Sequence, residues 1–135
     1  MMTRDLMTKQ VASVRATDST AVAARLMWDC DCGALPVLDD EGRAIAMITD
    51  RDICMAALMR DRAPSAIPVS DAMSRELQCC GPDDSVSFAE QLMRTHQVRR
   101  IPSVDRERHP LGLLSLADIC AAPTRELNPP VPPVI

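Results

Sequence analysis

The chain has 135 residues, of which 47% are hydrophobic, so it is long enough to fill the core of one ordinary compact domain. Its net charge of -4 and its lack of aromatic residues other than Trp28 and Phe88 argue against a general nucleic-acid surface. No apolar run approaches the roughly 20 residues that cross a bilayer, and residues 1–5 lack the apolar core of a signal peptide. We therefore expect a cytoplasmic protein without membrane contact, whose six cysteines are free thiols.

The chain contains an internal repeat. Residues 5–57 align with residues 71–123 without a gap, and fourteen aligned positions are identical. One block of identity is Asp52-Ile53-Cys54, which falls on Asp118-Ile119-Cys120. So many matches at one fixed offset indicate a duplication.

In chain order, the first repeat begins with a short extended segment, residues 13–16. Asp18-Ser19 then opens a helix, because these side chains accept hydrogen bonds from the first helical amides. Two short apolar runs, residues 35–38 and 45–48, flank an acidic turn and predict a β-hairpin. A second helix begins at Thr49.

The second repeat follows the same order. An extended segment at residues 78–80 precedes a helix that Asp84-Ser85 opens, and residues 101–104 and 111–114 form the second hairpin. Its second helix begins at Ser115. Apolar residues at helical spacing on the first helix of each repeat are predicted core positions: Val22, Leu26, Met27, Phe88, Leu92 and Met93.

Each repeat therefore has the order β-α-β-β-α, which places the protein in the α/β class. A unit of about 60 residues is marginally stable alone, so we expect the repeats to pack sheet against sheet about a pseudo-two-fold axis and to share one core. The first repeat covers residues 1–62 and the second covers residues 63–122. The five prolines in residues 123–135 predict a Pro-rich, disordered C-terminal tail.

The same short motif follows the last strand of each repeat: Thr49-Asp50-Arg51-Asp52-Ile53 and Ser115-Leu116-Ala117-Asp118-Ile119. One interpretation is a capping box, in which the hydroxyl and the carboxylate satisfy amides at the helix start. The other is a ligand site, where the hydroxyl contacts a phosphate and the carboxylate accepts hydrogen bonds from ribose hydroxyls. The motif alone leaves both open.

These motifs, together with Gly33-Ala34-Leu35-Pro36-Val37, Arg99-Arg100-Ile101-Pro102-Ser103 and the duplication, resemble a tandem pair of CBS domains, known as a Bateman module. The resemblance covers roughly residues 3–122, and the wording of the motifs is similar to that of stand-alone bacterial pairs of the hypoxic-response type. It implies frequent homodimers and two clefts between the repeats that bind AMP, ATP or S-adenosylmethionine. It implies no catalysis.

Carried over to this sequence, the resemblance implies ligand contacts from six residues: Thr49, Asp52, Arg99, Arg100, Ser115 and Asp118. The aspartates would hold ribose hydroxyls, the hydroxyl residues would contact phosphate or ribose, and the arginines would bind phosphate. In the first repeat, the positions equivalent to the two arginines are Gly33 and Ala34, and Ala46 replaces the glycine found at Gly112, so its methyl group narrows that cleft.

The charges of the two copies are opposite. Residues 28–43 carry five acidic side chains against one arginine, a balance of -4, whereas residues 94–109 carry five arginines against two acids, a balance of +3. A phosphorylated ligand is therefore expected to prefer the second repeat. The alternative is that these arginines are solvated or pair with acids of a dimer partner.

Neither a metal site nor an enzyme is the favoured interpretation of the sequence. Cys30, Cys32 and the pair Cys79-Cys80 lack C-x-x-C spacing, and no nucleophile motif is present. Cys54 and Cys120 are predicted to be small buried residues.

Three functional hypotheses remain. The leading one is a non-catalytic regulatory module that binds an adenosine-type ligand as a homodimer and signals to an unknown protein target. The second is a ligand-independent dimeric interaction or stress-response scaffold, and the third is a thiol or metal sensor.

Overall fold

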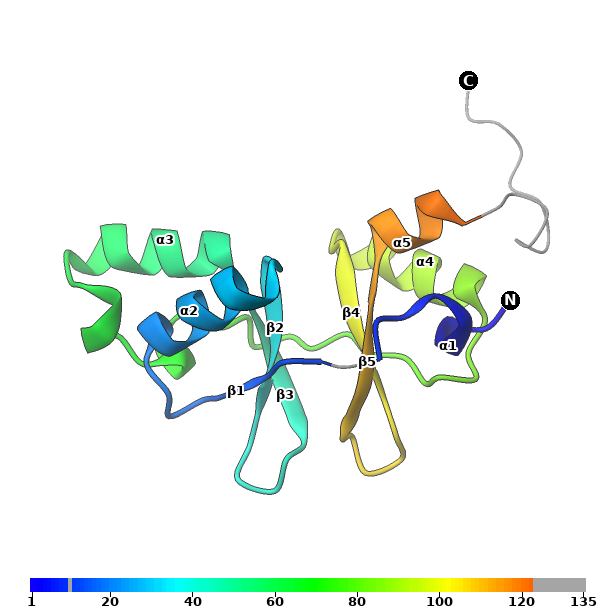
Figure 1. Ribbon diagram of the computed structural model, residues 1–135, viewed down its shortest axis with the longest axis horizontal. Coiled ribbons are helices and arrows are strands. Elements are labelled where there is room, and N and C mark those ends of the chain that lie inside the picture. The colour runs from blue at the N-terminus through cyan, green and yellow to red at the C-terminus, as the bar shows by residue number, and fades with distance from the viewer. Residues whose placement is uncertain (10, 123–135) are drawn as a thin grey trace. The chain divides into compact units, whose positions relative to one another are not determined.

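The computed structural model describes residues 1–9 and 11–122, which form two compact units (Figure 1). Val11–Leu77 make up the first-repeat unit, and residues 1–9 with residues 78–122 make up the second-repeat unit. Both units combine helices with strands, so the predicted α/β class is confirmed. The predicted tail, residues 123–135, lies outside the described residues.

The first-repeat unit contains one three-stranded sheet with the strand order β1-β2-β3. β1 runs parallel to β2, and β2 runs antiparallel to β3. Two α-helices and two single-turn 3-10 helices complete the unit. The bounds are β1 Val14–Arg15, α2 Thr20–Cys30, β2 Ala34–Leu38, β3 Ala44–Thr49, α3 Asp50–Arg60, η1 Pro64–Ala66 and η2 Val69–Asp71.

The second-repeat unit has the same plan around a two-stranded antiparallel sheet. Its elements are α1 Thr3–Leu6, α4 Val86–His96, β4 Arg100–Val104, β5 Pro110–Ser115 and α5 Leu116–Ala121. The extended segment predicted at residues 78–80 is reduced to one parallel bridge between Cys80 and Ser103.

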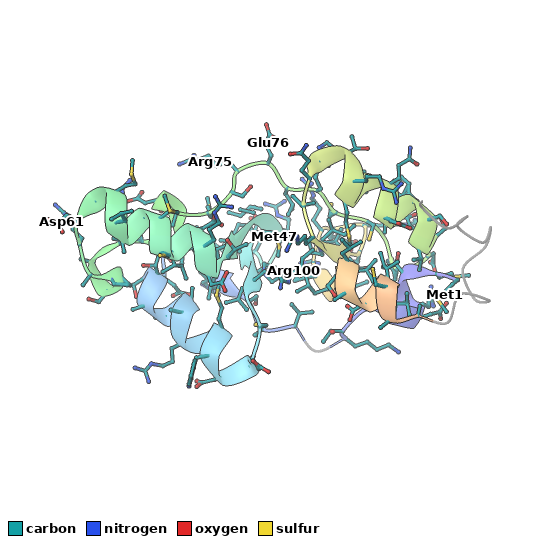
Figure 2. All side chains as sticks on the ribbon, turned by 90° about the horizontal axis from the view of Figure 1, so that it is seen from above. Met1, Met47, Asp61, Arg75, Glu76 and Arg100 are labelled. Carbon is teal, nitrogen blue, oxygen red and sulfur yellow. The ribbon has the colours of Figure 1, made fainter. Side chains whose placement is uncertain are left out.

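The helices begin where the sequence predicts. Ser19 caps α2 by accepting a hydrogen bond from the Val22 amide at 3.3 Å, and Ser85 caps α4 by accepting one from the Phe88 amide at 3.1 Å. The two serine caps supply partners for helix-start amides that lack one. α3 ends at Arg60, and the next residue, Asp61, adopts a left-handed backbone with φ of 50° and points its side chain outward in Figure 2.

Each unit has its own cluster of buried residues, in which helices cover the sheet. Leu35 and Ile48 pack with Met27 in the first-repeat unit, and Ile101 and Leu114 pack with α4 in the second-repeat unit. The expectation that the repeats pack sheet against sheet and share one core stays a prediction.

Two of the six predicted core positions are wrong. Val22 is 45% exposed and Phe88, its equivalent in the second repeat, is 44% exposed. Both lie in the first turn of their helix, on the side away from the sheet, while Ala23 and Ala89 take the buried place. Helical spacing had identified the apolar stripe but not its edge.

Each compact unit includes a short segment that belongs to the other repeat in the sequence. The Thr3 amide donates to the Asp84 carbonyl at 2.8 Å, and the Val69 amide, at the equivalent position, donates to the Asp18 carbonyl at 2.7 Å. Residues 3–8 thus belong to the second-repeat unit and residues 69–74 to the first-repeat unit. The compact units therefore do not coincide with the sequence repeats, whose boundary at residues 62 and 63 stays a prediction.

Residues 3–8 approach β5 closely. Thr8 and Leu113 exchange two backbone hydrogen bonds, of 2.9 and 3.0 Å, beside Gly112. A Cβ atom at Gly112 would lie 2.8 Å from the Thr8 carbonyl oxygen and at least as close to the Met7 side chain. Only glycine fits there without displacement. Ala46, its equivalent in the first repeat, is fully buried within the core cluster.

No helix in the described ranges is long and apolar enough to cross a membrane.

Exposed polar side chains, including the outward-pointing Arg75 and Glu76, lie on the segment that follows η2 (Figure 2).

Candidate functional site

The two helix-start motifs form the same reciprocal pair of hydrogen bonds. The Thr49 hydroxyl accepts from the Asp52 amide at 3.1 Å, and the Asp52 carboxylate accepts from the Thr49 amide at 3.0 Å. Ser115 and Asp118 repeat this arrangement at 3.0 and 3.1 Å. Both motifs are therefore capping boxes, which is the first of the two interpretations of the sequence.

The capping box leaves ligand-binding capacity unused. In each box the carboxylate bonds the backbone through Oδ2, and Oδ1 takes no part in the cap. An ionised carboxylate accepts several hydrogen bonds, and a serine hydroxyl that accepts one can still donate its own proton. Because Asp52 and Asp118 are half-buried rather than enclosed, a hydroxyl from outside can reach Oδ1. Capping and ligand binding are thus compatible in the same residues.

The β4–β5 ladder brings a cation to the second capping box. Arg100 lies directly opposite Ser115 in the antiparallel register (Figure 2 labels Arg100), and residues in directly opposite positions place their side chains on the same face of a sheet. The Leu116 amide, first in α5, donates to the Arg99 carbonyl at 2.7 Å. The structure therefore gathers Arg100, Ser115 and Asp118 at one corner of the second-repeat unit.

Arg99 has a different position from its neighbour. Its side chain lines a pocket of about 360 Å³ between α4 and the start of α5, together with Glu90, Arg94 and Leu116. Among the described residues, none of the ion pairs involves Arg99 or Arg100. Both guanidinium groups are exposed, so the second-repeat unit offers two positive charges that no carboxylate of the described chain neutralises.

The first-repeat unit lacks these cations. Ala34 lies opposite Thr49, and the Asp50 amide donates to the Gly33 carbonyl at 3.1 Å, so the backbone is the same but the arginines are absent. The difference between the two corners is therefore one of side chains alone. The arginine nearest the first capping box in the sequence is instead Arg51, in the first turn of α3, where the second repeat has Ala117.

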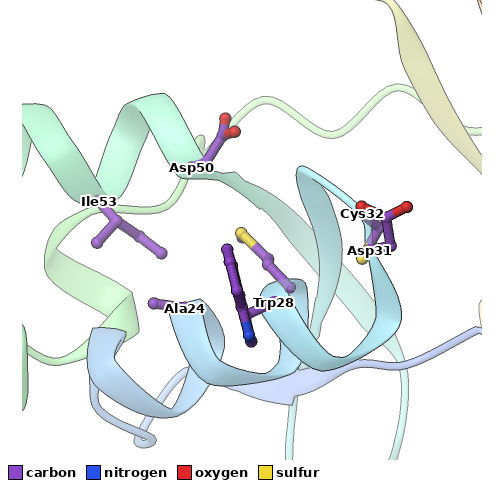
Figure 3. A pocket seen from close by; sticks show the side chains of 7 residues that line it. Ala24, Trp28, Asp31, Cys32, Asp50 and Ile53 are labelled. Atoms are coloured by element: carbon purple, nitrogen blue, oxygen red, sulfur yellow. The ribbon is translucent and has the colours of Figure 1, made fainter.

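The first-repeat unit has its own version of the helix-side pocket, with a volume of about 280 Å³ (Figure 3). Trp28 of α2 and Ile53 of α3 flank it, and the carboxylates of Asp31 and Asp50 lie at its rim. Apart from Ile53, the residues that Figure 3 labels align with residues that line the pocket of the second-repeat unit, where Arg94 replaces Trp28. One pocket is acidic and aromatic, and the other carries two arginines.

Three large apolar side chains on α2 and α3 are exposed. Trp28 is 86% exposed, Met59 78% and Leu58 70%, which is unusual for large apolar side chains. Cys54 and Cys120 were predicted to be buried and are exposed, because the adjacent isoleucines, Ile53 and Ile119, are the residues that α3 and α5 turn inward.

The hairpin turns hold two similar groups of charged residues. In the first-repeat unit, the Arg43 guanidinium contacts Asp39 at 2.9 Å and Glu41 at 2.7 Å. The backbone N–H of Arg43, followed by its side chain and the Glu41 amide, lowers the pKa of Asp39 against the opposing effect of partial burial. In the second-repeat unit, burial acts to raise the pKa of Asp105, but hydrogen bonds from the backbone and ring of His109 outweigh it and lower the pKa.

Comparison with known proteins identifies the family. The model of the CBS domain matches residues 4–59 and again residues 69–125. The CBS domain-containing protein YhcV of Bacillus subtilis is 40% identical over 116 residues, which cover 86% of this chain and 81% of YhcV.

Two solved structures share the fold. A crystal structure of Hypoxic Response Protein I with two coordinated zinc ions has a TM-score of 0.81 and 29% identity, covering 91% of this chain and all of that one. The CBS domain pair of protein MJ0100, in complex with 5′-methylthioadenosine and S-adenosylmethionine, has a TM-score of 0.80 and 22% identity, covering 89% of this chain and 93% of that one. The predicted resemblance is thereby confirmed: this chain belongs to the CBS domain family, as a tandem pair of CBS domains that form a regulatory module.

Proposed function

We propose that this chain is a non-catalytic regulatory module that binds an adenosine-type ligand carrying a phosphate, such as AMP or ATP, through its second-repeat unit. The observation that carries the proposal is the register of β4 and β5, which sets Arg100 opposite Ser115 beside Asp118. The CBS pair of MJ0100, which shares the fold, binds two adenosine compounds, and this guides the choice of ligand class.

Each side chain has a distinct part in this proposal. Asp118 accepts a ribose hydroxyl at Oδ1 while Oδ2 keeps the helix cap, and Ser115 donates its hydroxyl proton to a phosphate oxygen. Arg100 supplies a planar fork of donors that matches a phosphate group, and Arg99 adds a second positive charge nearby. Thr49 and Asp52 offer the same ribose contact, but Gly33 and Ala34 stand in place of Arg99 and Arg100, so the first-repeat unit binds the phosphorylated ligand more weakly.

Isothermal titration of the full chain with AMP, ATP, S-adenosylmethionine and adenosine tests this function. We expect AMP and ATP to bind more tightly than adenosine, because only they reach Arg100 with a phosphate. Replacement of Arg100 with alanine should lower AMP affinity by roughly 10- to 100-fold, the usual worth of a hydrogen bond to a charged group, and should leave adenosine binding unchanged. Absence of heat and of thermal shift at millimolar ligand would refute the proposal.

The structure provides a matched control for the carboxylate. Asp118→Ala removes both the proposed ribose contact and a capping box, whereas Asp52→Ala removes an equivalent capping box in the first-repeat unit. Both variants should lose about 1 kcal/mol of stability through the cap. Asp118→Ala should abolish the tighter AMP binding of the second-repeat unit, whereas Asp52→Ala should leave that binding unchanged. Equal loss of binding in both variants would mean that folding, and not ligand contact, explains the effect.

A second candidate function, a ligand-independent dimeric scaffold, is supported by the exposure of three large apolar side chains in the first-repeat unit, Trp28, Leu58 and Met59. Tryptophan and methionine are enriched at the centres of protein interfaces. The occupant that fits best is a second copy of this chain, because the acidic residues Asp29 and Asp31 follow Trp28 while the equivalent position in the second repeat is Arg94.

The charges favour a head-to-tail dimer, in which α2 of one protomer faces α4 of its partner. An arginine over an indole ring gains a cation–π attraction, and the flanking aspartates add to it. Light scattering after size exclusion should find a dimer that Trp28→Asp dissociates. If Trp28→Asp remains a dimer of unchanged stability, this face is not the contact. A monomeric wild type would reject the scaffold outright.

A further inference from the structure

The hairpin between β4 and β5 brings together three side chains that the proposed nucleotide function does not use. Asp105, Glu107 and His109 each place one potential ligand atom so that all three atoms lie within 4.8 Å of one another. The Asp105 carboxylate accepts hydrogen bonds from the amides of Glu107 and His109 at 2.9 and 2.8 Å, and from the His109 ring at 3.2 Å. The turn therefore fixes two carboxylates beside an imidazole.

The equivalent turn of the first-repeat unit shows what these carboxylates hold when a cation is available. Asp39 accepts the same two amide bonds, both at 2.9 Å, so the turn closes identically. There the third position is Arg43, whose guanidinium bonds both carboxylates, at 2.9 Å to Asp39 and at 2.7 Å to Glu41. A positive charge shared by the two carboxylates is thus a feature of the turn, independent of the backbone bonds that close it.

In the second-repeat unit, His109 occupies the position of Arg43. A guanidinium has only N–H donors and cannot bind a metal ion, whereas an imidazole ring has nitrogens that can. The substitution therefore replaces a built-in cation with a third ligand atom.

We propose that Asp105, Glu107 and His109 form a binding site for a divalent transition-metal ion of the Zn²⁺ and Co²⁺ type. One imidazole nitrogen with carboxylate oxygens is a donor set that such ions accept, and three protein ligands leave a coordination position for water. The metal supplies the positive charge that Arg43 supplies in the other turn. Arg106 and Arg108 flank the site and oppose the ion electrostatically, so the affinity is modest.

Titration of the full chain with Co²⁺, followed by calorimetry and by optical absorption, tests the site. Co²⁺ bound through nitrogen and oxygen lacks the near-ultraviolet charge-transfer bands of cobalt thiolates, so the six cysteines are distinguished from the hairpin. His109→Arg reproduces the composition of the first turn and should lose one Co²⁺ equivalent while keeping the thermal stability of the metal-free protein. Binding should also raise the melting temperature of the wild type and not that of His109→Arg.

The first turn provides a reciprocal variant. Arg43→His gives it the three ligand types of the second turn and should add one Co²⁺ equivalent, of higher affinity because Asp40 and Gly42 stand where the second turn has Arg106 and Arg108. Retention of the full Co²⁺ stoichiometry by His109→Arg, binding accompanied only by thiolate bands, or no gain in Arg43→His would each overturn the proposal. None of these results depends on whether the protein binds AMP.

Discussion

The close approach of residues 7 and 8 to Gly112 makes a strong stability prediction. In Gly112→Ala, the new methyl group would lie 2.8 Å from the Thr8 carbonyl oxygen and from Met7 Cγ, well inside ordinary contact distance. The Met7 side chain can rotate away, but the carbonyl is held by the Leu113 amide at 3.0 Å. Relief therefore requires a shift of the bridge between Thr8 and β5.

The expected loss follows from two opposing effects. Overpacking of this kind costs about 1 to 3 kcal/mol. Alanine also restricts the unfolded chain, which returns about 0.4 to 1 kcal/mol where its backbone conformation is allowed. The middle of each range, about 2 and about 0.7 kcal/mol, leaves a net loss of about 1.3 kcal/mol, which lowers the melting temperature of a chain of this size by roughly 4 to 5 °C.

Thermal unfolding followed by circular dichroism measures this loss, and amide exchange locates it. The Leu113 amide should exchange faster in Gly112→Ala, because its acceptor is the displaced Thr8 carbonyl. In a Met7→Ala background the substitution should cost less, since one of the two clashing groups is gone. An unchanged or higher melting temperature, with normal protection of the Leu113 amide, would refute the reasoning.

Three further predictions follow from other residues. The Ser103 hydroxyl is buried and has no hydrogen-bond partner in the described chain. Ser103→Val, which copies Val37 of the first repeat, should therefore raise the free energy of unfolding by about 1 kcal/mol in denaturant titrations. A lower free energy of unfolding would show that the hydroxyl has a hydrogen-bond partner. Burial raises the pKa of Cys80 to about 11, so the folded state favours the thiol form and should lose stability as pH rises from 9 towards 11. At pH 8, Cys80 should also react with iodoacetamide far more slowly than the exposed Cys54, and equal rates would contradict this. In a head-to-tail dimer, mild oxidation should join Cys54 to Cys120 of the partner subunit, whereas peptide mapping that finds only Cys54 joined to Cys54 would indicate the opposite orientation.

The duplication explains why so much of the fold was predictable. Capping residues announce their helices locally, so the starts of α2, α3, α4 and α5 could be located from single motifs such as Thr49-x-x-Asp52. The alignment of the repeats also pairs Thr49 with Ser115 and Asp52 with Asp118, which occupy equivalent positions in the two capping boxes. Whether Asp118 and Arg100 bind a nucleotide remains a prediction.

Features that depend on orientation or on distant contacts could not be derived in this way. Val22 and Cys54 lie beside inward-facing residues, and a rotation of one position on a helix changes burial entirely. The charges of Asp105, Glu107 and His109 were counted in the sequence, but only the closed turn shows that the three side chains converge. Attachment of residues 1–9 to the second-repeat unit involves partners that are remote in the sequence, such as Thr3 and Asp84, 81 positions apart.

The exchange of short segments between the repeats has a consequence for the order of folding during synthesis. The first-repeat unit is continuous from Val11 to Leu77, so it can fold as soon as Leu77 has left the ribosome. Thr3 and Thr8 are translated before that unit but pair with Asp84 and Leu113, which are translated after it. They therefore find their native partners only after the first-repeat unit is complete, and they close the second-repeat unit over a loop that contains the whole of the first.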